Sequence, residues 1–129
     1  MSKTKVSKIN SAVEDERGKI VDILTDEQIE HVNLITFKKG AIRANHYHEK
    51  SLHFNFVLSG SLKLITKAPQ EATKSVIIKP GELVEISPME RHALIALEDT
   101  ELLVFTRGPR GGENYEKDTY RLSSNDSLI

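Results

Sequence analysis

Short apolar runs separated by turn residues recur along most of this chain, and they constrain its fold more than any other feature. The runs are rich in β-branched residues and leucine, which favour extended strands. They span residues 20–24, 32–37, 41–47, 52–58, 62–66, 75–79, 83–86, 93–97 and 102–106. The turn signals between them are Lys39-Gly40, Ser59-Gly60, Pro80-Gly81, Ser87-Pro88 and Glu98-Asp99. Turns at intervals of roughly ten residues are typical of an all-β sandwich or barrel.

The length and composition describe one domain with few options for its chemistry. With 129 residues the chain can bury one core but has no room for a second domain of ordinary size. It has no cysteine, which excludes disulfides, zinc ribbons, iron–sulfur clusters and cysteine nucleophiles. Its 18 Lys and Arg residues balance 19 Asp and Glu residues, so net charge favours neither nucleic acid nor an anionic membrane as a partner. The apolar runs are too short for a secretory signal or a membrane span, and we expect a cytoplasmic protein.

Both ends of the chain are expected to lie outside the barrel. We predict a flexible arm over residues 1–9, a barrel over 15–107 and a C-terminal loop and tail over 108–129, all within a single domain. The glycine-rich loop that follows Arg107 could act as a lid, but it lacks the lysine and hydroxyl residues of a nucleotide P-loop. The capping-box spacing of Thr25 and Gln28 predicts a turn or a single helical turn.

Alternation within residues 52–58 predicts a strand with two different faces. One face would carry Leu52, Phe54, Phe56 and Leu58, and the other His53, Asn55 and Val57. If the second face lines a polar site inside a barrel, the first must be covered by another sheet or another subunit, because large apolar patches are rarely left in water. We therefore expect a homodimer. The alternative is that the apolar face is simply the core and that His53 faces solvent.

Histidine spacing is the strongest functional signal in the chain. His46 and His48 share a face of one expected strand, His53 follows them closely, and His92 lies about forty residues further on. These four rings can converge on one point. Such a set of imidazoles predicts a site for one divalent transition metal, Fe, Zn, Ni, Co or Mn, without choosing between them. The alternative is a group of hydrogen-bonded interior histidines that hold no metal.

The spacing of these histidines resembles the first motif of the cupin superfamily. That motif runs here from Gly40 through His46, His48 and His53 to Gly60, and His53 stands where the family usually has Glu. The resemblance implies an all-β fold, the cupin-type jelly-roll β-barrel or double-stranded β-helix. It also implies that the histidines at these positions are the metal ligands.

A second cupin motif is recognisable from Gly81 to His92, with His92 at the remaining ligand position. Pro88 of the motif is present. The departures from the family pattern are Ser87 at its usual Pro, Met89 at its usual Gly and Ala96 at its usual Asn. Four neutral histidines would leave about two positive charges on a bound divalent ion. The expected ligand is therefore an anionic or enolisable oxygen donor.

Three further stretches resemble cupins that act on nucleotide sugars. Residues 15–20 resemble the entry strand of deoxysugar 3,5-epimerases and 3,4-ketoisomerases. Residues 43–48 resemble the Arg-Gly-x-His-x-His segment of those ketoisomerases and of capsule-polysaccharide cupins, and residues 114–120 resemble the end of the capsule domains. These resemblances imply a sugar or nucleotide-sugar isomerase or epimerase that works through an enolate.

Candidate residues for this chemistry can be named beside the histidines. The carboxylates Glu49 and Glu90, or a histidine not held by metal, could move the proton. The candidates for binding a small-molecule substrate, possibly a nucleotide sugar, are Arg43, Tyr47, Asn55, Arg91 and Arg107, because guanidinium groups bind phosphates in bidentate fashion. By strict alternation Arg43 faces away from His46, so it reaches the cavity only if a bulge or bend lies between them.

Two other functions fit the same residues. One is an Fe(II)-dependent dioxygenase of a small chelating acid or diketone, although four protein ligands leave little room for both substrate and O2. The other is a non-catalytic cupin that senses or binds a small molecule. The chain has no pattern for a helix-turn-helix, so such a sensor would need a separate DNA-binding partner.

Overall fold

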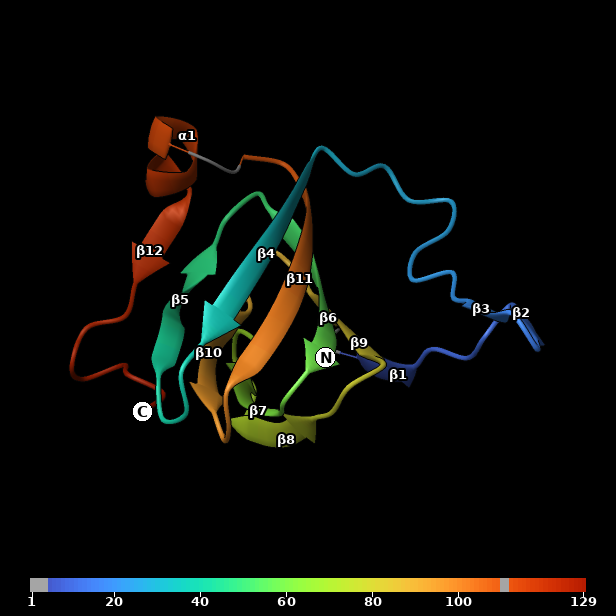
Figure 1. Ribbon diagram of the computed structural model, residues 1–129. Helices are drawn as coiled ribbons and strands as arrows, with labels where there is room; N and C mark the ends of the chain where they lie inside the picture. Colours follow the sequence, from blue (N-terminus) through green and yellow to red (C-terminus); the bar gives the residue numbers. More distant parts are fainter. Residues whose placement is uncertain (1–4, 110–111) are drawn as a thin grey trace.

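The computed structural model of this chain describes residues 5–109 and 112–129 and consists mainly of two five-stranded antiparallel sheets (Figure 1). The first sheet has the strand order β1 (Lys5–Lys8), β9 (Glu82–Ile86), β6 (Leu52–Ser59), β11 (Thr100–Arg107), β4 (His31–Phe37). The second has the order β12 (Thr119–Arg121), β5 (Ile42–His48), β10 (Arg91–Ala96), β7 (Leu62–Lys67), β8 (Lys74–Ile78). A small hairpin of β2 (Val13–Asp15) and β3 (Gly18–Ile20) and the helix α1 (Gly112–Lys117) complete the fold.

The hydrophobic core lies between the two sheets. Both contribute side chains that are fully buried, such as Val57 and Leu102 from the first sheet and Leu64 from the second. Burial alternates along β11, where every second residue from Thr100 to Thr106 is buried. This is the period that one packed face of a strand dictates. The expectation of an all-β barrel is therefore confirmed.

Most expected strands are present, with shifts of one or two residues at their ends. The strand expected over residues 20–24 is wrong, because β3 ends at Ile20 and residues 21–30 contain no strand. No helical turn forms at residues 25–28 either. Part of the segment expected to be a flexible arm forms a strand instead, since Lys5–Lys8 pair with Glu82–Glu85 in β9. Residues 1–4, and positions 110 and 111 of the expected lid loop, lie outside the described residues.

Strand β6 has the two faces that its alternation predicts. His53, Asn55 and Val57 point toward the barrel interior, and the aromatic rings of Phe54 and Phe56 lie on the other face. Both rings are nevertheless buried within the single chain, at 5% and 7% exposure. The apolar face of β6 therefore needs no second subunit to cover its phenylalanines.

No helix among the described residues is long and apolar enough to cross a membrane. The helix α1 is short and lies beside β12 at one side of the molecule (Figure 1). The β2–β3 hairpin stands away from the barrel on the opposite side, and all six of its strand residues are exposed.

Candidate active site

The interior of the barrel contains a cavity of about 200 Å³. Its apolar lining residues come from β4, β5, β9, β10 and β11. The polar residues that line it are Arg43, His46, His53, Asn55, His92 and Tyr115. A cavity with apolar walls and a few converging polar groups is the usual form of a small-molecule site.

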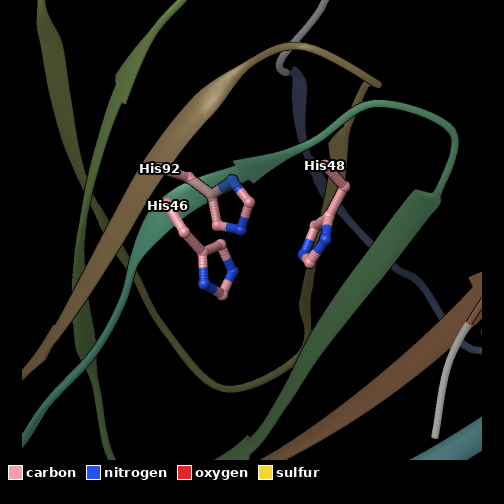
Figure 2. A group of neighbouring side chains, drawn as sticks. All are labelled: His46, His48 and His92. Atoms are coloured by element: carbon pink, nitrogen blue, oxygen red, sulfur yellow. The ribbon is translucent and has the colours of Figure 1, made fainter. Parts of the chain in front are cut away.

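Three histidines converge beside this cavity (Figure 2). His46 and His48 come from β5 and His92 from the neighbouring strand β10, where His92 pairs directly with His46. The rings of His46 and His92 are 4.7 Å apart between centroids, and those of His46 and His48 are 4.5 Å apart. One nitrogen of each of the three lies within 4.8 Å of the others. All three side chains are buried.

Backbone carbonyls fix the tautomers of two of these rings. Nδ1 of His48 lies 3.2 Å from the carbonyl oxygen of Asp118, and Nδ1 of His92 lies 3.0 Å from that of Glu90. A carbonyl can only accept a hydrogen bond, so each Nδ1 must carry its proton and donate it. In the neutral ring, Nε2 then keeps the lone pair that can bind a metal or accept a proton.

His53 lies beside this group but is not a member of it. Its ring centroid is 4.5 Å from that of His48 and 6.3 Å from that of His92. Of the four histidines expected to share one site, the structure therefore brings His46, His48 and His92 together as one potential ligand set. His53 joins them as a separate ring on the wall of the cavity.

The triad His46, His48 and His92 fits a divalent metal in the chemistry of its donors. Metal-binding histidines usually donate their second ring N–H to a carbonyl or carboxylate, as His48 and His92 do here. In a tetrahedral zinc site the ligand nitrogens lie about 3.4 Å apart. The nitrogens of this triad are within 4.8 Å of one another, so small side-chain rotations would bring them to that separation.

A bulge in β5 brings Arg43 to the cavity. The register of β5 against β10 shifts between His92 and Ala93, which pair with His46 and Ala44, so that Asn45 has no partner across the strands. This extra residue reverses the alternation, and Arg43 and His46 both line the cavity. Strand alternation in the sequence required a bulge or bend between Arg43 and His46 for Arg43 to reach the cavity, and the structure contains that bulge.

The bulge has an unfavourable backbone. Ala44 and Asn45 have positive φ angles of 70° and 59°. Asparagine tolerates this left-handed region, whereas alanine does so at a cost of about 1–2 kcal/mol.

We predict that Ala44→Gly raises the free energy of unfolding by about 1 kcal/mol, because glycine adopts the left-handed backbone without this cost. Urea denaturation would measure the change. Ala93→Gly is the matched control, since Ala93 is the cross-strand neighbour of Ala44 and lies within β10. There glycine should destabilise by about 1 kcal/mol. Equal losses for both variants would contradict the prediction.

Asn55 and Tyr115 add further polar groups to the cavity wall. Asn55 is 3% exposed, and its Nδ2 has no hydrogen-bond partner among the described residues. A buried donor of this kind costs free energy unless a ligand or water accepts its hydrogen bond. Tyr115 reaches the cavity from α1, and its ring lies 5.3 Å from that of His48. Sequence reasoning did not select Tyr115, because its approach depends on how the C-terminal segment folds back.

Tyr47, Arg91 and Arg107 lie outside the cavity. Tyr47 stacks on Tyr120 with ring centroids 5.1 Å apart, and the guanidinium of Arg91 lies 4.8 Å above the Tyr47 ring. Arg107 is paired with Glu27 at 2.6 Å. Of the three arginines expected to bind substrate, the cavity therefore includes Arg43.

The two candidate carboxylates also do not line the cavity. Glu49 is exposed and accepts a hydrogen bond of 3.2 Å from the hydroxyl of Tyr120. This bond and the charge of Glu49 raise the pKa of Tyr120. Glu90 is 2% exposed, and its backbone carbonyl accepts the hydrogen bond from His92.

A buried aspartate anchors the C-terminal segment next to the histidines. The Asp118 carboxylate accepts hydrogen bonds from the backbone N–H groups of Lys50 and Ser51, at 2.9 and 3.1 Å, and from the Ser51 hydroxyl at 2.7 Å. The same carboxylate lies 4.0 Å from Nδ1 of His48. A single aspartate thus fixes the loop after β5 and places a negative charge beside one of the rings.

Comparisons with known proteins agree with this fold and site. A family model described as Cupin domain matches residues 33–106, and the chain therefore belongs to the cupin family. The jelly-roll fold expected from the two motifs is confirmed with it. No protein of curated function matches the sequence significantly.

Several solved structures share the architecture. The 3,4-ketoisomerase QdtA from Thermoanaerobacterium thermosaccharolyticum, solved as a double mutant with TDP, is 25% identical with a TM-score of 0.77, over 96% of this chain and 91% of that one. A 3,4-ketoisomerase from Helicobacter canadensis is 17% identical with a TM-score of 0.80, over 98% and 96%. The rmlC epimerase from Mycobacterium tuberculosis is 14% identical with a TM-score of 0.78, over 95% and 70%.

Proposed function

We propose that this cupin is a nucleotide-sugar isomerase or epimerase. The observation that carries the proposal is the joining of three features in one cavity: a histidine cluster, the guanidinium of Arg43 and the amide of Asn55. These groups suit a keto sugar attached to a diphosphate, because the rings can move protons and the guanidinium can bind an anion. The likeness to a ketoisomerase that was solved with TDP supports this substrate class.

The cavity is large enough for only one part of such a substrate. Pockets that hold whole drug-sized ligands measure about 300–1,000 Å³. The cavity here measures about 200 Å³, which suits a sugar ring but not a complete nucleotide sugar. The nucleotide would therefore lie outside it. Arg43 is exposed and also lines the cavity, so its guanidinium is placed to bind the diphosphate between the two parts.

The reaction itself needs a base beside a keto group. Removal of a proton from the carbon next to the carbonyl gives an enolate, and return of the proton to another face or atom gives the epimer or the isomer. His48 does not itself line the cavity, but it can hold this proton through the neighbouring rings, because the Asp118 carboxylate lies 4.0 Å from its Nδ1 and stabilises the imidazolium. Its neighbours His46 and His53 line the cavity.

The experiment that tests this function uses TDP and TDP-4-keto-6-deoxyglucose, a compound found bound to a variant of the T. thermosaccharolyticum enzyme. Binding of TDP to the folded chain should raise its melting temperature in proportion to the logarithm of its concentration. Incubation with the keto sugar in heavy water should place deuterium on a substrate carbon. Saturable binding without exchange would instead indicate a non-catalytic binding protein.

The His46–His48–His92 triad also supports a second possibility, a divalent metal, because two of its rings donate Nδ1–H to carbonyls. A bound metal would act as a Lewis acid on the developing oxyanion. It would occupy the Nε2 lone pair of His48, and His53 would then be the cavity ring left to move the proton.

Metal content per chain, measured by elemental mass spectrometry on protein purified without a His tag, tests this possibility. If the triad binds metal, His92→Ala should lose it and His53→Ala should keep it, because His53 is outside the ligand set. Iron together with O2 uptake would favour the dioxygenase over the isomerase. Metal-free protein that turns over the keto sugar would assign the cluster to proton transfer alone.

We also propose that the chain forms a homodimer through strand β4. This strand is one of the two edges of the first sheet, and on it Val32 and Leu34 remain 59% and 58% exposed. They continue the apolar face of the sheet, since they pair with Phe105 and Leu103 of β11. An exposed apolar edge strand is a template for pairing with a second copy.

We predict that Leu34→Lys converts the dimer to a monomer, because a lysine ammonium at the centre of such an interface would be buried without a partner. Light scattering after size-exclusion chromatography measures the mass. Val76→Lys is the control, since Val76 is exposed on β8, an edge strand of the other sheet. It should leave the mass unchanged. A monomeric parent, or a dimeric Leu34→Lys, would contradict the interface.

A further inference from the structure

We propose that Asn45 and the last residues of the chain together form a positioning device that holds Arg43 in the cavity. The proposal rests on the proposed function for the role of Arg43 in binding, but the device itself is a property of the backbone. It consists of the bulge in β5, where Ala44 and Asn45 have a left-handed backbone, and of the tail, residues 122–129, which binds the bulge.

The bulge decides which way Arg43 points. In a regular strand, residues three apart lie on opposite faces, so Arg43 would face away from a cavity that contains His46. Here Asn45 is unpaired across to β10, and Arg43 lines the cavity with His46. Arg43 also donates a hydrogen bond of 3.0 Å to the Thr36 carbonyl, and its guanidinium lies 5.2 Å from the Phe37 ring centroid. Its position at the cavity thus depends on one extra residue in β5.

The bulge needs support from outside the strand. Two consecutive residues other than glycine, Ala44 and Asn45, hold positive φ angles. Such conformations persist only where surrounding contacts determine them. A regular β5 without the bulge would relieve both residues, and it would turn Arg43 away from the cavity.

The C-terminal tail supplies those contacts. Nδ2 of Asn45 donates to Oγ of Ser127 at 3.0 Å, and Oδ1 of Asn45 accepts from the backbone N–H of Leu128 at 3.0 Å. The carbonyl of Asn45 accepts from the backbone N–H of Leu122 at 3.1 Å. Both ends of the Asn45 amide and its carbonyl are thus bound by one segment about 80 residues later in the chain. The tail expected over residues 108–129 is therefore bound to β5 at its end.

The experiment removes the tail contacts without touching the cavity. Deletion of residues 127–129 takes away both partners of the Asn45 side chain. Asn45→Gly keeps a residue that accepts the left-handed backbone but has no amide, and Asn45→Asp keeps the acceptor for Leu128. Ser123→Ala is the matched control, because the Ser123 hydroxyl binds Asp126 within the tail.

The first measurement is independent of activity. The Nε–H resonance of Arg43 in ¹⁵N-labelled protein, assigned by its loss in Arg43→Lys, reports where the guanidinium lies. The deletion and Asn45→Gly should shift it, while Ser123→Ala should leave it in place. An unshifted Arg43 resonance in the deletion variant would overturn the proposal, whether or not the protein binds any nucleotide.

The second measurement is the split between KM and kcat for the keto-sugar nucleotide. Loss of a charge-assisted contact from Arg43 should raise KM by about ten- to a hundredfold and change kcat little. The deletion should act in the same direction, Asn45→Asp should recover part of the loss, and Arg43→Ala combined with the deletion should be no worse than Arg43→Ala alone. Fully additive effects would overturn the proposal. If the parent binds no TDP, the proposed function fails, and the resonance of Arg43 still decides whether the tail positions it.

Discussion

Replacing His48 with asparagine should lower turnover of the keto-sugar nucleotide by about 10²- to 10⁴-fold, the range lost when a general base is removed. The asparagine amide can still donate a hydrogen bond to the Asp118 carbonyl, which His48 meets at 3.2 Å through Nδ1. It cannot take up a proton. The variant should therefore fold and bind TDP as the parent does, and it should fail to exchange substrate hydrogen with solvent.

The matched control is Glu49→Gln. Glu49 is the carboxylate next to His48 in sequence, but it is exposed and hydrogen-bonded to Tyr120 outside the cavity. Its replacement should change turnover by less than about threefold, as expected of a surface position away from the reacting atoms. Single-turnover deuterium exchange measured on both variants would separate a histidine base from a carboxylate base.

A different result would reassign the proton step. If His53→Asn loses exchange while His48→Asn keeps it, the base is the ring outside the triad. If a metal occupies the triad His46, His48 and His92, both variants should instead lose exchange, and only His48→Asn should lose the metal, because His48 would be a ligand and His53 the base. Measured together with metal content, the two variants thus distinguish a metal-free cluster from a metal centre.

The sequence is most informative where a local pattern decides the structure. The alternation in residues 52–58 correctly predicts the inward face of β6, because neighbouring strands on both sides force the regular pleat. The run at residues 20–24, where a strand was wrongly expected, is also apolar, but beyond Ile20, which pairs with Val13, it forms no strand. Hydrogen bonding to a second strand, which the local pattern does not contain, decides whether such a run becomes a strand.

The candidate site shows the same division. His46 and His48 lie on the same face of β5 because they are two residues apart on one strand. His92 lies beside them because β10 is the neighbour of β5. The contributions of Tyr115 and Asp118 come from a C-terminal segment that folds back on the barrel. That return is fixed by hydrogen bonds to backbone groups near residue 50, which have no signature in the side-chain pattern. Long-range contacts of this kind cannot be derived from periodicity alone.

The second large effect concerns the turn between β6 and β7. Gly60 has a φ of 87°, and a Cβ there would overlap the Thr100 side chain and the Asp99 carbonyl and lie 2.7 Å from Cα of Thr100. Two of these atoms belong to the backbone, which cannot move as a flexible side chain can. We predict that Gly60→Ala lowers the free energy of unfolding by at least about 3 kcal/mol, the sum of backbone strain and overpacking.

Gly40→Ala isolates the backbone part of this cost. Gly40 has nearly the same φ, 86°, but a Cβ there meets nothing within 4 Å. Its replacement should cost about 1–2 kcal/mol through the left-handed backbone alone. The difference between the two variants in urea denaturation therefore measures the close approach of the β6–β7 turn to Thr100, whose hydroxyl accepts a hydrogen bond from the Ser61 backbone N–H at 3.1 Å. Equal costs would mean that this approach relaxes freely, and the turn would then contribute nothing beyond its backbone conformation.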